Sequence, residues 1–321
     1  ERERESSRET LVGASAMASA PSSLTWSQAR HVDTVIFVDV DGVLNIGAAD
    51  SGEAPLLLNK TNIDISMKAW GHHHNHAQRD CIEKMVYLAQ KDLGHGEDST
   101  YAKFACVGSS SVSEELARRL ADIIRTGGDR NRVAVVMSSN WRKTQHAARV
   151  RKLEESVARH LGSSFEFDAK TPNRSEQVAS DRLESIGDFL SELSKQRAGV
   201  SHTLKALILE DFFITGMDGW TCGGVRMNSV ADAEAYLERR APSAKAKLVH
   251  CYDKWVTDSG LEVRVGSGLT RERVEDATAF LLDRAEEEQK VEVVKQELSV
   301  GKRRSIMERT KLLAKLPGSG K

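Results

Sequence analysis

Several residue types and patterns are scarce in this chain, and their scarcity excludes whole classes of protein. The 321 residues include five prolines, and aromatic residues make up 5%, so the chain is neither Pro-rich nor collagen-like. No window holds about 18 uncharged apolar residues, so we expect no membrane-spanning helix. The formal net charge of −1 offers no strong nucleic-acid-binding signal, because such binding needs a basic surface.

Cysteine is also rare, and its spacing argues against a structural zinc site. No two cysteines form the CxxC pair that such sites usually use. We therefore expect a reduced, intracellular protein, most simply a cytoplasmic one. Residues 1–30 are expected to be disordered or extended, and a processed mitochondrial or other organellar leader is the alternative for this segment. The cysteines are Cys81, Cys106, Cys222 and Cys251.

What the chain does contain is three short apolar runs that each end in polar residues. The runs are residues 35–38, residues 133–137, and Leu204 together with residues 206–209. Apolar runs of this length are typical of strands that are buried on both faces of a parallel sheet. The residues that follow the runs are Asp39-Val40-Asp41-Gly42, Ser138-Ser139-Asn140 and Glu210-Asp211.

Helical periodicity occurs between these runs. Apolar residues repeat at helical spacing over residues 116–123, 150–161 and 183–193, and Ser111 with Glu114 predicts a capping box before the first helix. Strands that alternate with helices predict an α/β fold with a doubly wound, mostly parallel sheet. Ligands of such folds bind at the carboxyl ends of the strands, where the acids and hydroxyls of this chain lie.

The polar strand ends resemble motifs I, II and IV of the haloacid dehalogenase superfamily of aspartyl phosphatases. The residues that carry the resemblance are Asp39-x-Asp41-Gly42, Ser138 and Glu210-Asp211. A plain Asp-Gly turn is the alternative for the first motif. An EF-hand loop does not fit, because its sixth position would be Leu44 instead of glycine.

The resemblance implies roles for the acidic residues. Asp39 would attack phosphorus, and Asp41 would protonate the leaving oxygen and later activate water. Mg²⁺ would offset the repulsion between carboxylate and phosphate. Its ligands would be Asp39, Asp211 or Glu210, and the backbone carbonyl of Asp41. Gly42 would permit the tight turn that aims both aspartates at the pocket.

The same resemblance calls for groups that bind the phosphate. Ser138 would hydrogen-bond a phosphate oxygen. The superfamily usually adds a Lys or Arg near the start of the helix that precedes the motif IV strand. Arg182 fits by position and Lys170 fits by residue type, and we slightly favour Lys170 while keeping both.

A closer resemblance concerns Ser138-Ser139-Asn140-Trp141-Arg142. It is similar to the (S/T)-x-W-R motif of a poorly characterised branch of the superfamily, some members of which occur as domains in proteins proposed to repair RNA ends. The similarity spans about residues 33–282, except for the insertion between the first two apolar runs. It implies that Ser139 and Arg142 bind phosphate; packing against Trp141 is the alternative for Arg142. Glu210 replaces the more common Asp of an Asp-Asp pair, which puts metal geometry and turnover in question.

Between the first two apolar runs the chain is far longer than a βαβ unit of about 30 residues. We expect a cap inserted at about residues 47–110 of a core domain that covers residues 31–282. Within it, His72-His73-His74-Asn75-His76 offers ligands for zinc or nickel, but no nearby acid or cysteine completes a geometry. We therefore expect a polar loop or a substrate-facing edge there.

The end of the chain suggests a docking element. Residues 271–298 have helical periodicity, and residues 302–321 hold seven Lys/Arg and one Glu. We expect residues 283–321 to form a C-terminal helix and basic tail. The function expected is a Mg²⁺-dependent phosphohydrolase for a phosphorylated small molecule, nucleotide or nucleic-acid end. The alternative is a catalytically quiescent structural subunit of a larger assembly, which docks on a protein partner through this tail.

Overall fold

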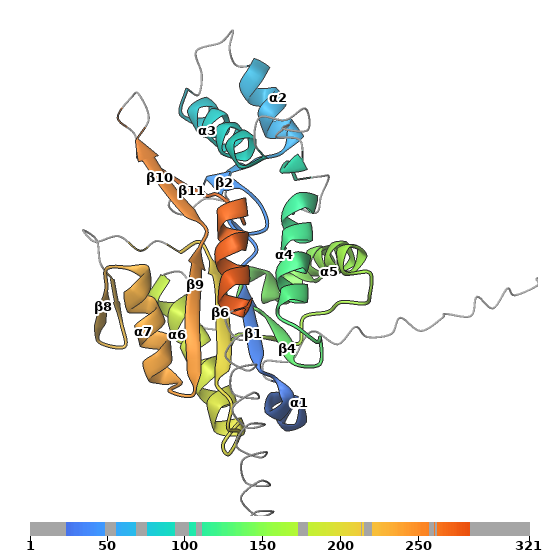
Figure 1. The fold of residues 1–321 in the computed structure, drawn as a ribbon. Coiled ribbons are helices and arrows are strands. Elements are labelled where there is room, and N and C mark those ends of the chain that lie inside the picture. The colour runs from blue at the N-terminus through green and yellow to red at the C-terminus, as the bar shows by residue number, and fades with distance from the viewer. Residues whose placement is uncertain are drawn as a thin grey trace, which may run out of the picture.

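The computed structural model describes residues 24–48, 56–68, 76–93, 103–106, 111–172, 179–212, 214, 220–256, 260 and 262–282. A parallel sheet lies at the centre, with helices on both faces (Figure 1). Among the described residues no helix has the length and hydropathy to cross a membrane. The four cysteines all lie within the described residues, and none forms a disulfide. The basic tail at 283–321 and His72-His73-His74 lie outside the described residues, so the structure does not test either prediction.

Five strands form the central sheet in the order β5-β4-β1-β6-β9, and every pairing is parallel. The three strands predicted from apolar runs, β1, β4 and β6, lie side by side and are buried along their whole length. The edge strands β5 and β9 were not predicted. The bounds are β1 Thr34–Val38, β4 Val133–Met137, β5 Ala169–Lys170, β6 Leu204–Glu210 and β9 Ala244–His250.

Alternate side chains of the sheet pack against different helix layers. Along β1, Ile36 and Val38 join one hydrophobic cluster, whereas Val35 and Phe37 join the other. The first cluster includes residues of α4 (Glu114–Thr126), α5 (Ala147–Leu161) and the helical segment 271–282. The second includes residues of α1 (Trp26–His31), α6 (Ala179–Gln196) and α7 (Val230–Arg240). The doubly wound sheet is therefore confirmed.

Connections from β1 run in opposite directions across the sheet. The chain passes from β1 to β4 and β5 on one side, and it then continues with β6 and β9 on the other. Strand order therefore reverses between β1 and β6. In open α/β sheets this reversal opens a crevice at the carboxyl ends of the strands, where ligands bind.

Two helix boundaries differ from the sequence predictions. The N-cap of α4 is Ser113, whose hydroxyl accepts from the Leu116 N–H, so the capping box predicted at Ser111 is wrong. Glu114 instead pairs with Arg159 of α5 at 2.8 Å. The segment expected to be disordered, residues 1–30, ends in helix α1, in which Ala29 is fully buried. Tertiary contacts decided both, because neither is visible in local periodicity.

The chain between β1 and β4 contributes to a second sheet, which is antiparallel and has the order β10-β11-β2-β3. Two of its strands come from this insertion and two from the segment after β9, so the layer above the carboxyl edge is composite (Figure 1). The bounds are β2 Gly47–Ala48, β3 Leu56–Leu57, β10 Tyr252–Val256 and β11 Glu262–Gly266, and the insertion adds the helices α2 (Lys60–Lys68) and α3 (His76–Leu93).

The insertion packs on the core instead of forming a separate hydrophobic unit. Buried residues of the insertion, Leu58, Met85 and Phe104 among them, belong to the same cluster as the α4 face. Asp92 of α3 forms a buried ion pair with Arg119 of α4 at 2.6 Å. Arg119 also donates to the Leu269 carbonyl, at 2.8 Å. These contacts hold the end of α3 against the core.

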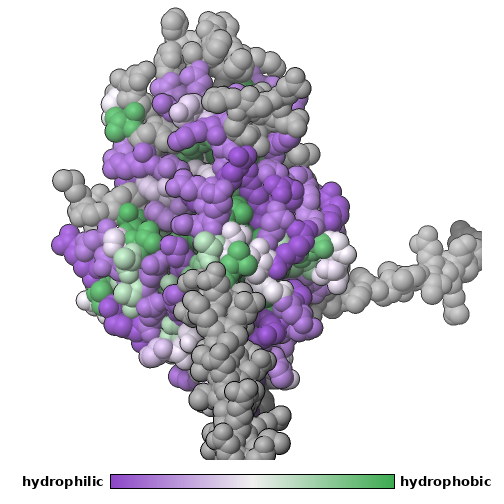
Figure 2. All heavy atoms as spheres, viewed as in Figure 1, coloured by the Kyte–Doolittle hydropathy of each residue, from purple (hydrophilic) through white to green (hydrophobic). Residues whose placement is uncertain are grey.

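Three short elements complete the described fold. The 3₁₀ turns η4 (Asn140–Arg142) and η5 (Thr144–His146) follow β4, and a hairpin of β7 (Trp220–Cys222) and β8 (Val225–Met227) follows β6. The face seen in Figure 2 is mostly hydrophilic, with hydrophobic residues in small separate groups. The large hydrophobic side chains exposed within the described residues are Tyr87, Val256 and Leu282.

Candidate active site at the carboxyl edge of the sheet

Strand register brings three predicted site residues into one row. Val38 at the end of β1 is level with Met137 of β4 and Leu209 of β6. The next residues are Asp39, Ser138 and Glu210, and the ladder continues through them, since the Asp39 N–H donates to the Leu209 carbonyl at 3.0 Å. The prediction that these side chains meet at one edge is therefore confirmed.

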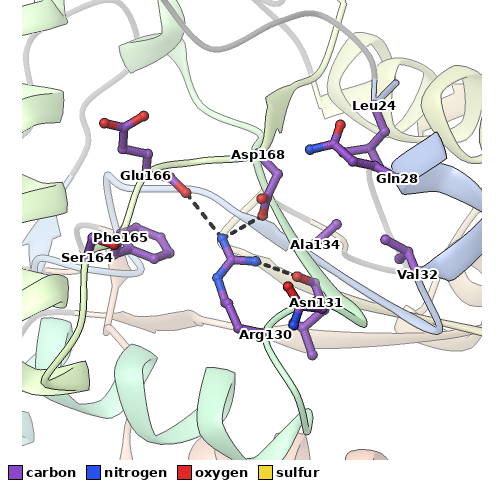
Figure 3. A pocket seen from close by; sticks show the side chains of 11 residues that line it. Leu24, Gln28, Val32, Arg130, Asn131, Ala134, Ser164, Phe165, Glu166 and Asp168 are labelled. Carbon is purple, nitrogen blue, oxygen red and sulfur yellow. Dashed lines mark hydrogen bonds and ion pairs between the residues drawn. The ribbon is translucent and has the colours of Figure 1, made fainter. Parts of the chain in front are cut away.

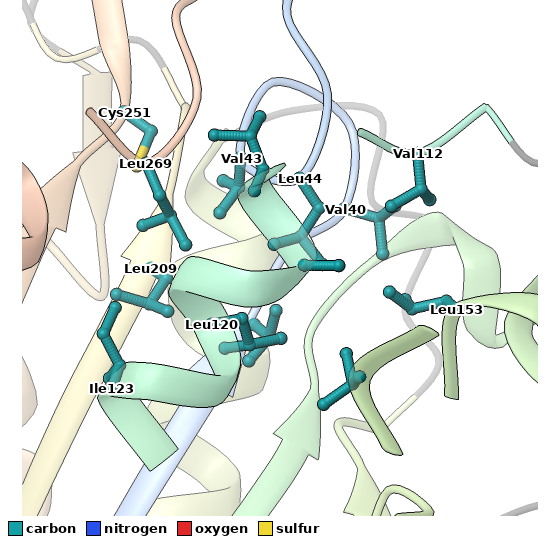
Figure 4. Packing of buried hydrophobic residues seen from close by; sticks show 14 of the residues in the cluster. Val40, Val43, Leu44, Val112, Leu120, Ile123, Leu153, Leu209, Cys251 and Leu269 are labelled. Atoms are coloured by element: carbon teal, nitrogen blue, oxygen red, sulfur yellow. The ribbon is translucent and has the colours of Figure 1, made fainter. Parts of the chain in front are cut away.

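The loop after β1 separates its polar and apolar residues. Val40, Val43 and Leu44 pack into the core beside α4 (Figure 4). The chain turns sharply here, because the Leu44 N–H donates to the Val40 carbonyl at 2.8 Å. Burial of the apolar side chains anchors the loop and holds Asp39 and Asp41 at the carboxyl edge of the sheet.

Two glycines allow three segments to meet at this loop. Gly42 has φ +78°, and a Cβ there would lie 2.0 Å from Asp211 Oδ2. A Cβ on Gly266, at the end of β11, would lie 2.1 Å from the Gly42 Cα. Any larger residue at either position would collide with the neighbouring segment. The prediction for Gly42 is confirmed, whereas Gly266 was not predicted, since its role depends on a segment distant in sequence.

Three carboxylates and one guanidinium form the centre of the site. Asp39, Glu210 and Asp211 each offer an oxygen within 4.8 Å of the others. Arg182, near the start of α6, contacts all three: it forms an ion pair with Asp39, lies 2.9 Å from Glu210 Oε2, and lies 3.8 Å from Asp211 Oδ1. Asp39 is 2% exposed and Glu210 is fully buried.

The charge of this group is unbalanced. When ionised, the three carboxylates and Arg182 together carry a net charge of −2. Burial raises the pKa of Glu210 well above its ordinary value, against the lowering effect of Arg182. Burial and the Asp39 charge likewise raise the pKa of Asp211. The pKa of Arg182 rises because the attraction of the three acids outweighs its burial, so Arg182 stays charged.

The same residues fit a divalent metal ion. Within the described residues, Asp39 Oδ2 and Glu210 Oε2 are buried oxygens that each form an ion pair with Arg182 and accept no other hydrogen bond. An all-carboxylate set suits hard cations such as Mg²⁺. Protonation of one acid would also relieve the repulsion, so protons would compete with a metal ion for these oxygens.

Asp41 lies beside this cluster and has its own set of contacts. The Trp141 indole N–H donates to Asp41 Oδ2 at 3.0 Å, and the Asn45 amide donates to Oδ1 at 3.0 Å. Asn45 is itself held, because its carbonyl oxygen accepts from the Gly42 N–H and its amide donates to the Ser111 carbonyl. Burial, and then the charge of Asp39, raise the pKa of Asp41, while both hydrogen bonds lower it.

The predicted phosphate-binding residues differ in position. The Ser138 hydroxyl donates to Glu210 Oε1 at 3.3 Å, so Ser138 lies in the site. Ser139 instead caps η4, with its hydroxyl accepting from the Trp141 N–H. Arg142 is buried and donates to the Ser139 carbonyl at 2.7 Å. Its pKa falls to about 10 through burial and the nearby charge of Arg182.

Of the two candidate cations, Arg182 contacts all three acids. Lys170 ends β5, level with Met137 of β4, and that strand is separated from β1 by β4. The sequence preference for Lys170 rested on residue type, whereas the ion pairs of Arg182 favour Arg182 for this position.

A hollow of about 430 Å³ lies elsewhere, at the amino ends of β1 and β4 (Figure 3). Arg130 is the cation of its lining, and its guanidinium is already engaged by Asp168 at 2.7 Å and by the Val133 carbonyl. Phe165 packs over the guanidinium, with its centroid 5.7 Å away. The residues that line this hollow do not include the acids or the strand-end residues of the candidate site.

Comparison with known proteins found no matching family model, curated protein or solved structure.

Two contacts of the site were not predicted from sequence. Trp141 was noted as part of a motif, but its hydrogen bond to Asp41 spans 100 residues. Asn45 follows Asp41 by four residues. An amide at this short spacing from an acid could have predicted the hydrogen bond between them.

Proposed function

We propose that this protein is a metal-dependent phosphohydrolase that forms an aspartyl-phosphate on Asp39. The observation that carries the proposal is the buried cluster of Asp39, Glu210 and Asp211, with Arg182 as its cation and Asp41 alongside. Nucleophilic carboxylates, a general acid and a cation pocket are the groups that phosphoryl transfer needs. The sheet order, with its reversal between β1 and β6, supports the resemblance to the haloacid dehalogenase superfamily.

The reaction proceeds in two steps, formation of the aspartyl-phosphate and its hydrolysis. A carboxylate oxygen of Asp39 attacks phosphorus, the bond from phosphorus to the leaving oxygen breaks, and protonated Asp41 gives its proton to that oxygen. Asp41, now a carboxylate, takes a proton from water as the water oxygen attacks phosphorus. The bond between phosphorus and Asp39 then breaks, which releases phosphate and restores the carboxylate. Arg182 and the Ser138 hydroxyl bind phosphate oxygens during both steps.

Asp39, Glu210 and Asp211, together with the Asp41 carbonyl, would hold Mg²⁺. The ion would neutralise the excess negative charge and let a phosphate dianion approach a carboxylate. Asn45 and Trp141 hold the carboxyl plane of Asp41, and burial raises the pKa of Asp41 toward the range in which it can donate a proton.

Trapping of the intermediate tests the proposal directly. The purified chain is incubated with Mg²⁺ and a panel of phosphate esters, and phosphate release is measured. Borohydride added during turnover reduces an acyl phosphate, which would convert Asp39 to homoserine, located by mass spectrometry. We expect release and trapping in the wild type and neither in Asp39→Asn. Absence of hydrolysis and trapping across the panel would favour the quiescent structural subunit instead.

A further inference from the structure

The segment that follows β4 is unusually basic for this chain. From Ser138 to Leu153 the sequence has no acidic residue, whereas the whole chain is close to neutral. Lys143 and Arg149 from this segment are exposed, and His146 is half-buried. We call Lys143, His146 and Arg149 the basic rim.

Trp141 connects the basic rim to Asp41. Its indole N–H donates to Asp41 Oδ2, its ring stacks on His146 with centroids 6.2 Å apart and planes 19° apart, and the Arg149 guanidinium carbon lies 5.8 Å from the ring centroid. His146 and Arg149 are therefore one side chain away from the proposed general acid.

The rim cations are not neutralised by the protein. Within the described part of the chain, neither Lys143 nor Arg149 has a carboxylate partner, whereas Arg159 farther along α5 pairs with Glu114 at 2.8 Å. Helix α5 begins at Ala147 beside the rim, and its first turn has no side-chain cap and no acid. The first N–H groups of this helix add to the positive potential there.

We propose that the basic rim binds a second phosphate group, carried by the leaving alcohol of the substrate. This inference rests on the proposed function, because it takes Asp41 as the acid that protonates the leaving oxygen. The basic rim lies on one side of Asp41, so it would contact the leaving group. Its two cations, Lys143 and Arg149, and the N-terminus of α5 favour a leaving group that is an anion. The substrate class is a small bisphosphorylated alcohol. A nucleic-acid strand would need a longer basic surface.

A matched pair of substrates and a matched pair of variants test the rim. The substrates are the monophosphates and bisphosphates of 1,3-propanediol and 1,5-pentanediol. The two compounds of each pair differ only in whether the second hydroxyl carries a phosphate group. The rim variant is Lys143→Gln/Arg149→Gln. The control is Lys195→Gln/Arg239→Gln, which removes the same charge at the ends of α6 and α7 that lead into the amino edge of the sheet.

We expect kcat/KM of the wild type, counted per phosphate ester because a symmetric bisphosphate has two, to be about threefold to tenfold higher for a bisphosphate than for its monophosphate, the range that two exposed ion pairs give. Added salt should reduce this ratio. The rim variant should bring the ratio close to one, and the control should keep it. A ratio of one in the wild type, or a ratio that the rim variant retains, would overturn the proposal.

Binding separates failure of the rim from failure of the chemistry. Calorimetry on Asp39→Asn with each diol phosphate needs no turnover. Tighter binding of the bisphosphate, lost on adding Lys143→Gln/Arg149→Gln, supports the rim even if no ester is hydrolysed; equal binding of both compounds refutes it even if hydrolysis occurs. Turnover of 5′-phosphorylated oligonucleotides that rises with strand length would overturn the assignment to a small molecule.

Discussion

The two ends of strand β1 each carry a buried aspartate, and the two have opposite electrostatic surroundings. Asp33 at the amino end and Asp39 at the carboxyl end are both 2% exposed. Asp33 forms an ion pair with Arg132, and with His202 when that imidazole is protonated. Asp39 shares the cation Arg182 with Glu210 and Asp211.

This difference distinguishes the structural role that we expect for Asp33 from the functional role proposed for Asp39. A buried acid with sufficient cations is a fixed part of the fold. In a buried cluster with more acids than cations, the carboxylates repel one another, and a proton or a bound cation reduces this repulsion. Such an excess, located at a strand-order reversal, is therefore the better indicator of a site than burial alone.

The largest difference between the two ends should appear in turnover. Asp39→Asn removes the proposed nucleophile, and we expect kcat to fall by at least about 10⁴-fold. Asp33→Asn should leave kcat within about twofold and cost about 1–3 kcal/mol of stability through a broken buried pair. Steady-state kinetics and urea unfolding of both variants measure this. Comparable loss of kcat in the two would show that the acids do not differ in role.

The second test removes the cation from each end. Arg182→Gln removes the cation that contacts the three carboxylates, two of them buried, and should cost about 3–5 kcal/mol in the free energy of unfolding at pH 8. Arg132→Gln should cost less than about 1 kcal/mol, because Arg132 is 52% exposed and His202 remains. Denaturant unfolding gives both values.

The pH dependence of the Arg182→Gln loss follows from linkage. Glu210 and Asp211 have raised pKa values in the fold, so the folded state binds more protons than the unfolded state above the ordinary carboxyl pKa. Stability therefore falls as pH rises through that window. The loss should be smaller at pH 5 than at pH 8, and a loss independent of pH would contradict the charge argument.

Metal binding gives a third, smaller contrast. Mg²⁺ at about 100 times its Kd should stabilise the wild type by about 2.7 kcal/mol. The gain should be larger at pH 8 than at pH 5.5, because protons compete for Glu210 and Asp211. Asp211→Asn should reduce the gain, and Asp33→Asn should not. Thermal unfolding with and without Mg²⁺ measures this, and equal gains in both variants would exclude the cluster as the metal site.

The smallest expected effect concerns the orientation of Asp41. Trp141→Phe removes the indole donor that lowers the Asp41 pKa, so the pH–rate limb set by Asp41 should move to higher pH. We expect kcat to fall about tenfold at the wild-type optimum. Trp220→Phe makes the same chemical change in β7, where the ring packs on Phe212, and serves as control. An unshifted pH profile would mean that Trp141 only packs.

The sequence predicted the parts of this molecule that depend on neighbours in the chain. Continuous apolar runs identified β1, β4 and β6, because strands buried on both faces have no polar positions. The two-residue β5 is too short to show a pattern, and the edge strand β9 mixes lysines with apolar residues, so both were missed. The antiparallel sheet was missed because its strands are contributed by two distant segments.

The candidate site divides in the same way. Asp39, Asp41, Gly42, Ser138 and the Glu210-Asp211 pair were readable from sequence, because they lie at or just after strand ends and parallel strands end at a common edge. The contacts of Arg182 with the acids, the capping role of Ser139, and the Trp141 hydrogen bond are set by the tertiary structure. They depend on strand order, on the start of α6 and on the turn η4, which place atoms in contact across many residues. The sequence alone determined which chemical groups lie at the carboxyl edge of the sheet. Only the packing of the chain decided which of these groups contact the same cation.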